Sequence, residues 1–129
     1  MNLTRKIPLT KAMRFRIEYL PPHTVRIRAP LAPNRNHKGI AFAGAIHSAL
    51  VLAPWCLLTR LLEEQGIEAD VMVYRSEVKF LKPIRANFVA ECCAPDLFRK
   101  LASRRKRITL TSIIGDAAVF RGAFYIRAK

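Results

Sequence analysis

A long apolar segment in the middle of the chain restricts the possible folds more than any other feature. In Ile40–Leu62 the only basic side chains are His47 and Arg60, and no acidic residue occurs before Glu63. The polar run Asn36–Gly39 leads directly into this segment. A helix this apolar needs apolar structure over most of its surface. We therefore predict a buried helix over Ile40–Leu62, whose first backbone N–H groups lack helical partners and attract negative charge.

A membrane span is the main alternative for this segment, because about 20 apolar residues cross a bilayer. Three features argue against it: Pro54 lies in the middle, His47 and Ser48 are adjacent, and small residues crowd its start. Its flanks lack the aromatic residues that anchor spans at membrane interfaces. Met1–Lys11 is basic but leads into no apolar stretch of the signal-peptide type. We expect a core helix and no membrane span.

The length and charge of the chain limit its domain organisation and its partners. With 129 residues the chain is predicted to form a single domain, 1–129, and 51% hydrophobic residues exclude a disordered protein. The formal net charge is +14, from 23 Lys and Arg against 9 Asp and Glu. This imbalance favours a nucleic acid, an acidic carrier protein, a phosphorylated cofactor or an anionic membrane surface as partner, or it serves only solubility.

The positions of the cysteines and histidines argue against disulfide bonds and against a metal site. Cys92 and Cys93 are adjacent, and Cys56 lies in the apolar segment, so neither a disulfide framework nor a CxxC metal site is possible. We expect Cys56 to pack as a small hydrophobic residue. The 3 histidines have no Cys or acid at metal-ligand spacing. These features predict no metal site and fit a reducing cytoplasm.

Alternating apolar residues on both sides of the apolar segment predict strands. Before it, Pro8–Met13 is compatible with a short helical turn, and two alternating stretches separated by Pro21-Pro22 predict a hairpin. The apolar positions of that hairpin are Phe15, Ile17, Tyr19, Val25, Ile27 and Ala29. After the helix, which should end near Gly66, four more strands are expected. The first, Val71–Leu81, is predicted to be buried on both faces in its first half and on one face in its second.

The apolar positions of the last three strands are Phe88, Ala90 and Cys92, then Ile108, Leu110 and Ile114, then Phe120, Phe124 and Ile126. One helix for about six strands predicts an α+β architecture in which an antiparallel sheet curls around a single central helix. The free edge and open face of such a sheet favour pairing into a homodimer or a dimer of dimers.

Two segments resemble a known family. Ala29–Gly44 resembles the opening of the thioesterase family that forms the C-terminal half of YiiD-type acetyltransferase-like proteins. Val78–Pro83 is similar to the strand-ending pattern of that family, and the resemblance extends from Ile7 to the last strand. It implies the hotdog fold, in which an antiparallel sheet wraps around one long central helix. No acetyltransferase half is present in this chain.

The same region also resembles hotdog acyl-CoA thioesterases more broadly. Those proteins carry an Asn, a Gly three residues later, and His-Gly-Gly at the start of the helix. Three residues fall on these positions: Asn36, Gly39 and Gly44. Phe42 replaces the His, Ala43 replaces the first Gly, and Val51 occupies the place where many relatives have an acid in the helix. The resemblance implies a site for an acyl thioester from which the usual carboxylate is missing.

Thioester hydrolysis needs a polarised carbonyl and a positioned water. The backbone N–H groups of Ala43 and Gly44 are candidates for an oxyanion hole, supported by the helix dipole. Gly44 either allows close approach of the thioester or only permits tight packing of the helix against the sheet. Asn36 is a candidate for orienting the water, and His37 is either the general base or a solvated loop residue. His47 either acts directly or hydrogen-bonds a buried carbonyl.

Further residues are candidates for substrate binding. They are Lys38, Gly39, Phe42, His47, Glu77, Arg104 and Arg105. Phe42 would line the acyl tunnel or only support it, and Glu77 would reach the site of a partner subunit unless it simply faces solvent. Arg104 and Arg105 belong to a run of six cations from Arg99 to Arg107, which either binds phosphates or forms a solvated turn.

The sequence therefore predicts a cytoplasmic acyl thioesterase that acts on acyl-CoA or an acylated acyl carrier protein. Coenzyme A enters as part of the substrate, and no separate cofactor is expected. Water would attack directly, because no nucleophilic side chain is evidently placed. The alternatives are a non-catalytic protein that binds acyl-CoA or acyl carrier protein, and a basic nucleic-acid-binding module. The last is disfavoured because the cationic run has no interleaved aromatic residues.

Overall fold

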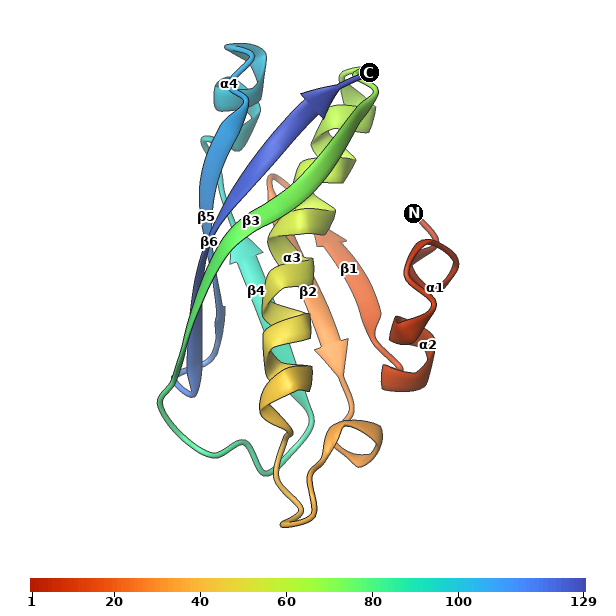
Figure 1. Ribbon diagram of the computed structural model, residues 1–129, viewed down its shortest axis with the longest axis vertical. Coiled ribbons are helices and arrows are strands. Elements are labelled where there is room, and N and C mark those ends of the chain that lie inside the picture. Colours follow the sequence, from red (N-terminus) through yellow and green to blue (C-terminus); the bar gives the residue numbers. More distant parts are fainter.

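The computed structural model describes residues 1–129 as a curved sheet packed against one long helix (Figure 1). The helices are α1 (Leu3–Lys6), α2 (Leu9–Met13), the 3-10 turn η1 (Ala32–Asn34), α3 (Ala43–Glu64) and α4 (Leu97–Ala102). The strands are β1 (Arg16–Leu20), β2 (Thr24–Ala29), β3 (Ala69–Phe80), β4 (Phe88–Cys93), β5 (Arg107–Ile114) and β6 (Ala118–Ala128). The strands form one antiparallel 6-stranded sheet in the order β1-β2-β4-β5-β6-β3. The predicted α+β architecture is confirmed.

Helix α3 is the centre of the hydrophobic core. It has 22 residues, which correspond to a length of about 33 Å, and it lies across the concave face of the sheet (Figure 1). Leu50 and Leu58 of α3 are fully buried, as are Ile27 of β2 and Phe120 of β6. Its length and composition would allow it to cross a membrane, but most of its apolar surface is buried within the protein. Helix α3 is therefore the core helix of this fold.

The helix starts three residues later than the sequence pattern predicts. Residues 40–42 are held extended by long-range hydrogen bonds, because the N–H of Ala41 donates to the Ile84 carbonyl at 2.8 Å and that of Phe42 to the Asn34 carbonyl at 2.7 Å. Ala41 also forms an isolated β-bridge with Arg35. Hydrophobicity alone cannot reveal these contacts, so the apolar pattern overstates the helix. The predicted end is confirmed, because α3 ends at Glu64, just before Gly66 with φ +70°.

One side of α3 is not fully covered by the rest of the chain. Residues that are exposed or half-buried recur there at helical spacing: Ala43, His47, Val51, Trp55 and Thr59. Figure 1 shows no helix or strand over the near side of the lower half of α3. This uncovered stripe is a surface on which a ligand or a second protein surface can lie.

The predicted burial of both faces in the first half of β3 is wrong. β3 is an edge strand that pairs only with β6, and Met72 and Tyr74 have exposed fractions of 41% and 56%. The register also shifts between Val73 and Arg75, so that Tyr74 is an inserted residue. Such an insertion reverses which alternate residues face the core. The faces read from simple alternation therefore do not hold across Tyr74.

The other predicted strands agree with the structure. The hairpin forms from β1 and β2, and the expected inward residues of β4, β5 and β6 are buried. Helix α4 was not predicted; it lies between β4 and β5 and overlaps the start of the cationic run. Its Leu97 and Leu101 are buried, which explains why this part of the run is helical and not an open turn.

A buried serine compensates for the proline inside α3. Pro54 has no N–H, so it cannot bond the carbonyl of Leu50, four residues earlier. The hydroxyl of Ser112, on β5 and only 1% exposed, donates to that carbonyl at 2.6 Å. The sheet thereby supplies the donor that the helix lacks, and this bond fixes α3 on β5.

We expect Ser112→Ala to destabilise the protein by about 1–3 kcal/mol, because the buried Leu50 carbonyl would lose its donor. The same change should cost clearly less in a Pro54→Ala background, where residue 54 regains an N–H. Urea unfolding of the four proteins of this double-mutant cycle measures the difference. An equal loss in both backgrounds would show that the serine does not compensate for the proline.

Candidate active site

The first turn of α3 presents two backbone donors that have no acceptor within the chain. Phe42 is the N-cap residue and makes no side-chain capping bond, whereas Ser, Thr, Asp or Asn would usually cap a helix. The first N–H groups with an acceptor are those of Ala45 and Ile46, which both donate to the Phe42 carbonyl at 3.0 Å. The N–H groups of Ala43 and Gly44 remain free. They are the donor pair that the sequence pattern predicts.

The space around Gly44 is occupied by an aromatic ring. A Cβ atom at Gly44 would lie 2.4 Å from Cε2 of Phe42, so only glycine accommodates the ring in this position. Phe42 has an exposed fraction of 55%, and its ring forms a wall beside the free N–H groups. Gly44 therefore makes room for Phe42 and not for the sheet, which was the alternative considered from the sequence.

His47 lies one turn further along α3 and contacts the edge strand. Its Nε2 is 3.2 Å from Oγ of Ser76 on β3, and its ring centroid is 6.2 Å from that of Phe120. His47 is half-buried and bonds a serine hydroxyl, not a backbone carbonyl as the alternative interpretation supposed. The sequence analysis missed Ser76, because the insertion at Tyr74 conceals which residues of β3 face α3. The structure thus joins His47 and Ser76 beside the open helix end.

Asn36 shapes the turn that precedes α3. Its Oδ1 accepts hydrogen bonds from the N–H groups of Lys38 at 2.9 Å and Ile40 at 3.3 Å, and Gly39 adopts φ +77°. His37 and Lys38 are exposed in this turn, which projects beyond the start of α3 (Figure 1). These residues lie at the same end of the molecule as Gly44. Their assigned roles in water activation and substrate binding stay predictions.

Asn34 is a supporting residue that the sequence analysis also missed. It is 3% exposed, and its Nδ2 donates to the carbonyls of Met13 and Pro30, each at 2.8 Å. The backbone carbonyl of Asn34 accepts a hydrogen bond from the N–H of Phe42, the residue that precedes the free donors. Two bonds from this buried side-chain amide and one to the backbone of the same residue fix the approach of the chain to α3. No pattern in the sequence marks it, because its partners are distant in the chain.

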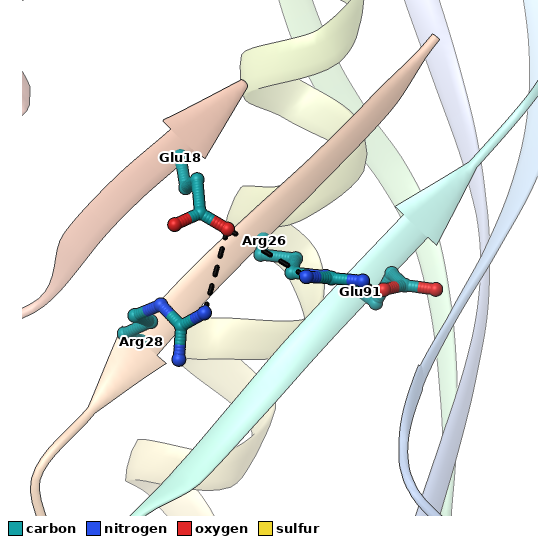
Figure 2. Close-up of polar contacts among 4 residues, drawn as sticks. All are labelled: Glu18, Arg26, Arg28 and Glu91. Atoms are coloured by element: carbon teal, nitrogen blue, oxygen red, sulfur yellow. Dashed lines mark hydrogen bonds and ion pairs between the residues drawn. The ribbon is translucent and has the colours of Figure 1, made fainter. Parts of the chain in front are cut away.

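Acidic side chains neutralise some of the exposed cations and leave others without a partner. Figure 2 shows Glu18 between Arg26 and Arg28 on the outer face of the sheet, with ion-pair distances of 3.7 and 3.4 Å. Arg26 also bonds Glu91 with Nε at 2.6 Å from Oε2, and this bond raises the pKa of Arg26. These side chains neutralise each other across β1, β2 and β4.

One cluster of cations without acidic partners lies in the turn after α4. Arg104, Arg105 and Lys106 have no acidic partner within ion-pair distance. They line a cavity of about 510 Å³ beside Leu62, at the C-terminal end of α3. Figure 1 shows α4 and the start of α3 at opposite ends of the molecule. The structure therefore does not bring Arg104 and Arg105 to Gly44 within one subunit.

Glu77 is also separated from the helix start within one subunit. Glu77 is paired in register with Arg121 of β6. Because it directly follows Ser76 in the strand, its side chain faces the opposite side of the sheet from that of Ser76. Glu77 lines an outer depression with Tyr74 and Arg75. A role for Glu77 in the site of a partner subunit stays a prediction.

The thiols provide no nucleophile for this site. Burial raises the pKa of Cys56 and of Cys92 to about 12, so both remain protonated at neutral pH. Cys93 is exposed on β4, and all three cysteines are free. No group of three His, Cys, Asp or Glu side chains is placed to hold a metal ion. The chemistry available at the helix start is that of backbone donors, His47 and the Ser76 hydroxyl.

A curved antiparallel sheet around one central helix, with an open helix start beside it, defines the hotdog fold. The chain belongs to the family described as "Putative thioesterase (yiiD_Cterm)", whose sequence profile matches residues 1–128. The resemblance identified from the sequence is thereby confirmed. No curated protein sequence matches the chain.

Solved structures share this fold over nearly the whole chain. A protein of unknown function, OLEI01261 from Chlorobaculum tepidum, is 26% identical with a TM-score of 0.89, covering 98% of this chain and 90% of its own. A putative thioesterase from Shewanella oneidensis is 20% identical with a TM-score of 0.86, covering 98% and 92%. A thioesterase from Haemophilus influenzae is 13% identical with a TM-score of 0.78, covering 98% and 89%.

Proposed function

We propose that this protein hydrolyses acyl thioesters of coenzyme A or of acyl carrier protein at the start of α3. Membership of a thioesterase family supports thioesterase activity in general. The observation that carries the proposal is the pair of free N–H groups at Ala43 and Gly44, one helical turn from His47. An uncapped helix start next to a histidine is suited to stabilise an oxyanion and to activate water.

The reaction begins with the thioester carbonyl at the first turn of α3. Its oxygen accepts hydrogen bonds from the N–H groups of Ala43 and Gly44, which stabilise the negative charge that develops as water adds to the carbonyl carbon. The tetrahedral intermediate then collapses, the C–S bond breaks, and the thiol leaves with a proton. The products are the carboxylate and the free thiol.

His47 takes the proton of the attacking water. In the tautomer whose Nε2–H donates to Ser76 Oγ, Nδ1 is a free acceptor. Ser76 is then a positioning residue that orients the ring and does not itself react. His47 thereby takes the role of the acidic residue that many relatives carry in the helix, where this chain has Val51. His47 then donates this proton to the sulfur of the leaving thiol.

The acyl chain lies along the uncovered stripe of α3. Val51 and Trp55 are half-buried there and provide apolar surface that continues from the helix start. Trp55 is itself fixed, because its Nε1 donates to the Val71 carbonyl of β3 at 3.0 Å. The three free thiols fit a reducing cytoplasm as the place of action.

A panel of acyl-CoA esters of increasing chain length tests the proposal. Release of the thiol is followed with a chromogenic thiol reagent, and saturable turnover is expected for at least one ester. Saturable binding without thiol release would favour the alternative, a non-catalytic protein that binds acyl-CoA or acyl carrier protein. Tight, salt-sensitive binding of DNA or RNA without acyl-CoA affinity would displace both.

Two variants of Asn36 separate a structural from a direct role in this reaction. Asn36→Ala removes the acceptor of two hydrogen bonds, which loosens the turn at a cost of about 1 kcal/mol and should slow turnover several-fold. Asn36→Asp keeps an acceptor at the same place and should retain most of the rate. If both variants lose activity equally, the amide group itself acts on the water or the substrate. An unchanged rate in Asn36→Ala would remove this residue from the site.

A further inference from the structure

A cavity with an apolar floor lies at the end of the molecule opposite the start of α3. It is formed where the C-terminal end of α3, helix α4 and the end of β6 come together (Figure 1). Its volume of about 510 Å³ falls within the range of small-molecule sites. The floor includes Leu62, Leu101 and Ile126, which have exposed fractions of 7% or less. Because packing in the core holds these side chains, the cavity is formed before any ligand enters.

The rim of this cavity carries cations that no acidic side chain neutralises. Arg104, Arg105 and Lys106 line it and are exposed, and none of them has a carboxylate within ion-pair distance. Glu68 is the only acid among the lining residues, so positive charge prevails. A concave surface with an excess of one charge attracts groups of the opposite charge. The rim therefore favours an anionic group.

The backbone holds these cations in place. The loop after α4 is bonded at both ends, because the N–H of Arg104 donates to the Leu101 carbonyl at 3.0 Å and the N–H of Ile126 donates to the Lys106 carbonyl at 2.7 Å. Arg104 has φ +58°, a left-handed conformation that the position after a helix usually gives to glycine. Strained positions of this kind cluster at ligand sites. A ligand that binds such a fixed loop loses little free energy to ordering it.

The lining discriminates among anionic ligands. None of the lining residues is aromatic, so a nucleotide base finds no aromatic ring on which to stack. The floor is aliphatic and suits a hydrocarbon chain, whose removal from water is favourable. The guanidinium groups of Arg104 and Arg105 suit a phosphate or a carboxylate, with which arginine forms paired hydrogen bonds. These properties together match a molecule with one aliphatic chain and one anionic head group.

We propose that this cavity is a second ligand site, which binds a single-chain anionic amphiphile with its head group on the Arg104–Lys106 cluster and its chain on the floor beside Leu62 and Ile126. The site is separate from the start of α3, which lies about 30 Å away along the helix. It does not depend on the proposed function, because no residue of this cavity takes part in thioester hydrolysis. Of the two roles considered for the cationic run, the structure favours anion binding over a solvated turn.

Calorimetry with octyl phosphate tests the site in the folded protein. One molecule should bind per chain, about tenfold or more tightly than inorganic phosphate, which lacks the chain, and than octanol, which lacks the head group. ADP should bind about tenfold more weakly than octyl phosphate, because its base has no stacking partner. Octanoate should occupy the same site, and the tighter of the two amphiphiles identifies the source of the ligand as a phosphate lipid or a fatty acid.

Variants of the cationic run locate the head group. Arg104→Ser/Arg105→Ser/Lys106→Ser should weaken octyl phosphate binding about tenfold or more, because charge-assisted hydrogen bonds are lost. Arg99→Ser/Arg107→Ser is the matched control, because it removes two exposed cations of the same run that do not line the cavity. The control should bind octyl phosphate as the parent protein does. Parental affinity in the triple variant would overturn the inference.

Arg104→Gly separates ligand binding from folding. Glycine adopts φ +58° without strain, so the free energy of unfolding should be unchanged or higher, while octyl phosphate should bind several-fold more weakly. Ala128→Trp places a large ring at an exposed position of the lining and should also abolish binding. The proposal fails if octyl phosphate does not bind, or if ADP binds as tightly. Binding of anionic phosphatidylglycerol vesicles without binding of octyl phosphate would assign the cations to a flat membrane surface and would equally exclude this site.

Discussion

An Ala43→Pro variant should fold as well as the parent protein and hydrolyse acyl thioesters about 10²–10³-fold more slowly, the loss typical of removing one oxyanion donor. Ala43 is the first residue of α3, and its N–H has no acceptor within the chain. Proline is favoured at the first position of a helix, where its missing N–H costs no helical bond. The preceding Phe42, at φ −69° and ψ 135°, has the extended conformation that a following proline requires.

The stability of this variant separates its chemical effect from a structural one. Proline in a compatible position restricts the unfolded chain, so the free energy of unfolding should be unchanged or up to about 1 kcal/mol higher. Ala43→Gly keeps the N–H and serves as the matched control, with activity near that of the parent. The loss in Ala43→Pro should appear in kcat, because the donor is needed most as charge develops. A proline variant with parental kcat would show that the thioester oxygen is bound elsewhere.

The fold was largely predictable because buried apolar residues follow either a long uninterrupted helical segment or the alternation of a strand. The helical core segment is recognisable since almost no polar residue interrupts Ile40–Leu62. The inward residues of β2 and β6 alternate without a break, and their apolar side is buried as expected. Each of these signals is local in the chain and needs no knowledge of neighbouring elements. The free donors at Ala43 and Gly44 were expected from the resemblance to the His-Gly-Gly segment of hotdog thioesterases and not from these patterns.

Other features depend on contacts that the sequence does not display. The start of α3 is set by hydrogen bonds of Ala41 and Phe42 to Ile84 and Asn34. Whether β3 is central or at an edge depends on strand order, and its exposed Met72 resembles a core residue in the sequence. His47 and Ser76 are 29 residues apart, so their pairing appears only in the folded chain. The residues at the helix start were therefore predicted from the sequence, whereas the pairing of His47 with Ser76 was not.

The second large effect is expected at His47. His47→Ala should lower kcat about 10²–10⁴-fold, because general base catalysis by a positioned side chain contributes that much, and should leave KM nearly unchanged. Ser76→Ala should lower kcat about tenfold or less, because it removes one hydrogen bond that orients the ring.

The double variant His47→Ala/Ser76→Ala decides whether the two residues act together. If Ser76 works only by orienting His47, the serine change should have almost no further effect once the histidine is absent, since coupled residues are not additive. His47→Gln keeps a polar group of similar size against Phe120 and controls for lost packing. Full additivity would mean that Ser76 contacts the substrate by itself. A His47→Ala variant with the parental rate would return the role of base to the turn, where His37 is the remaining candidate.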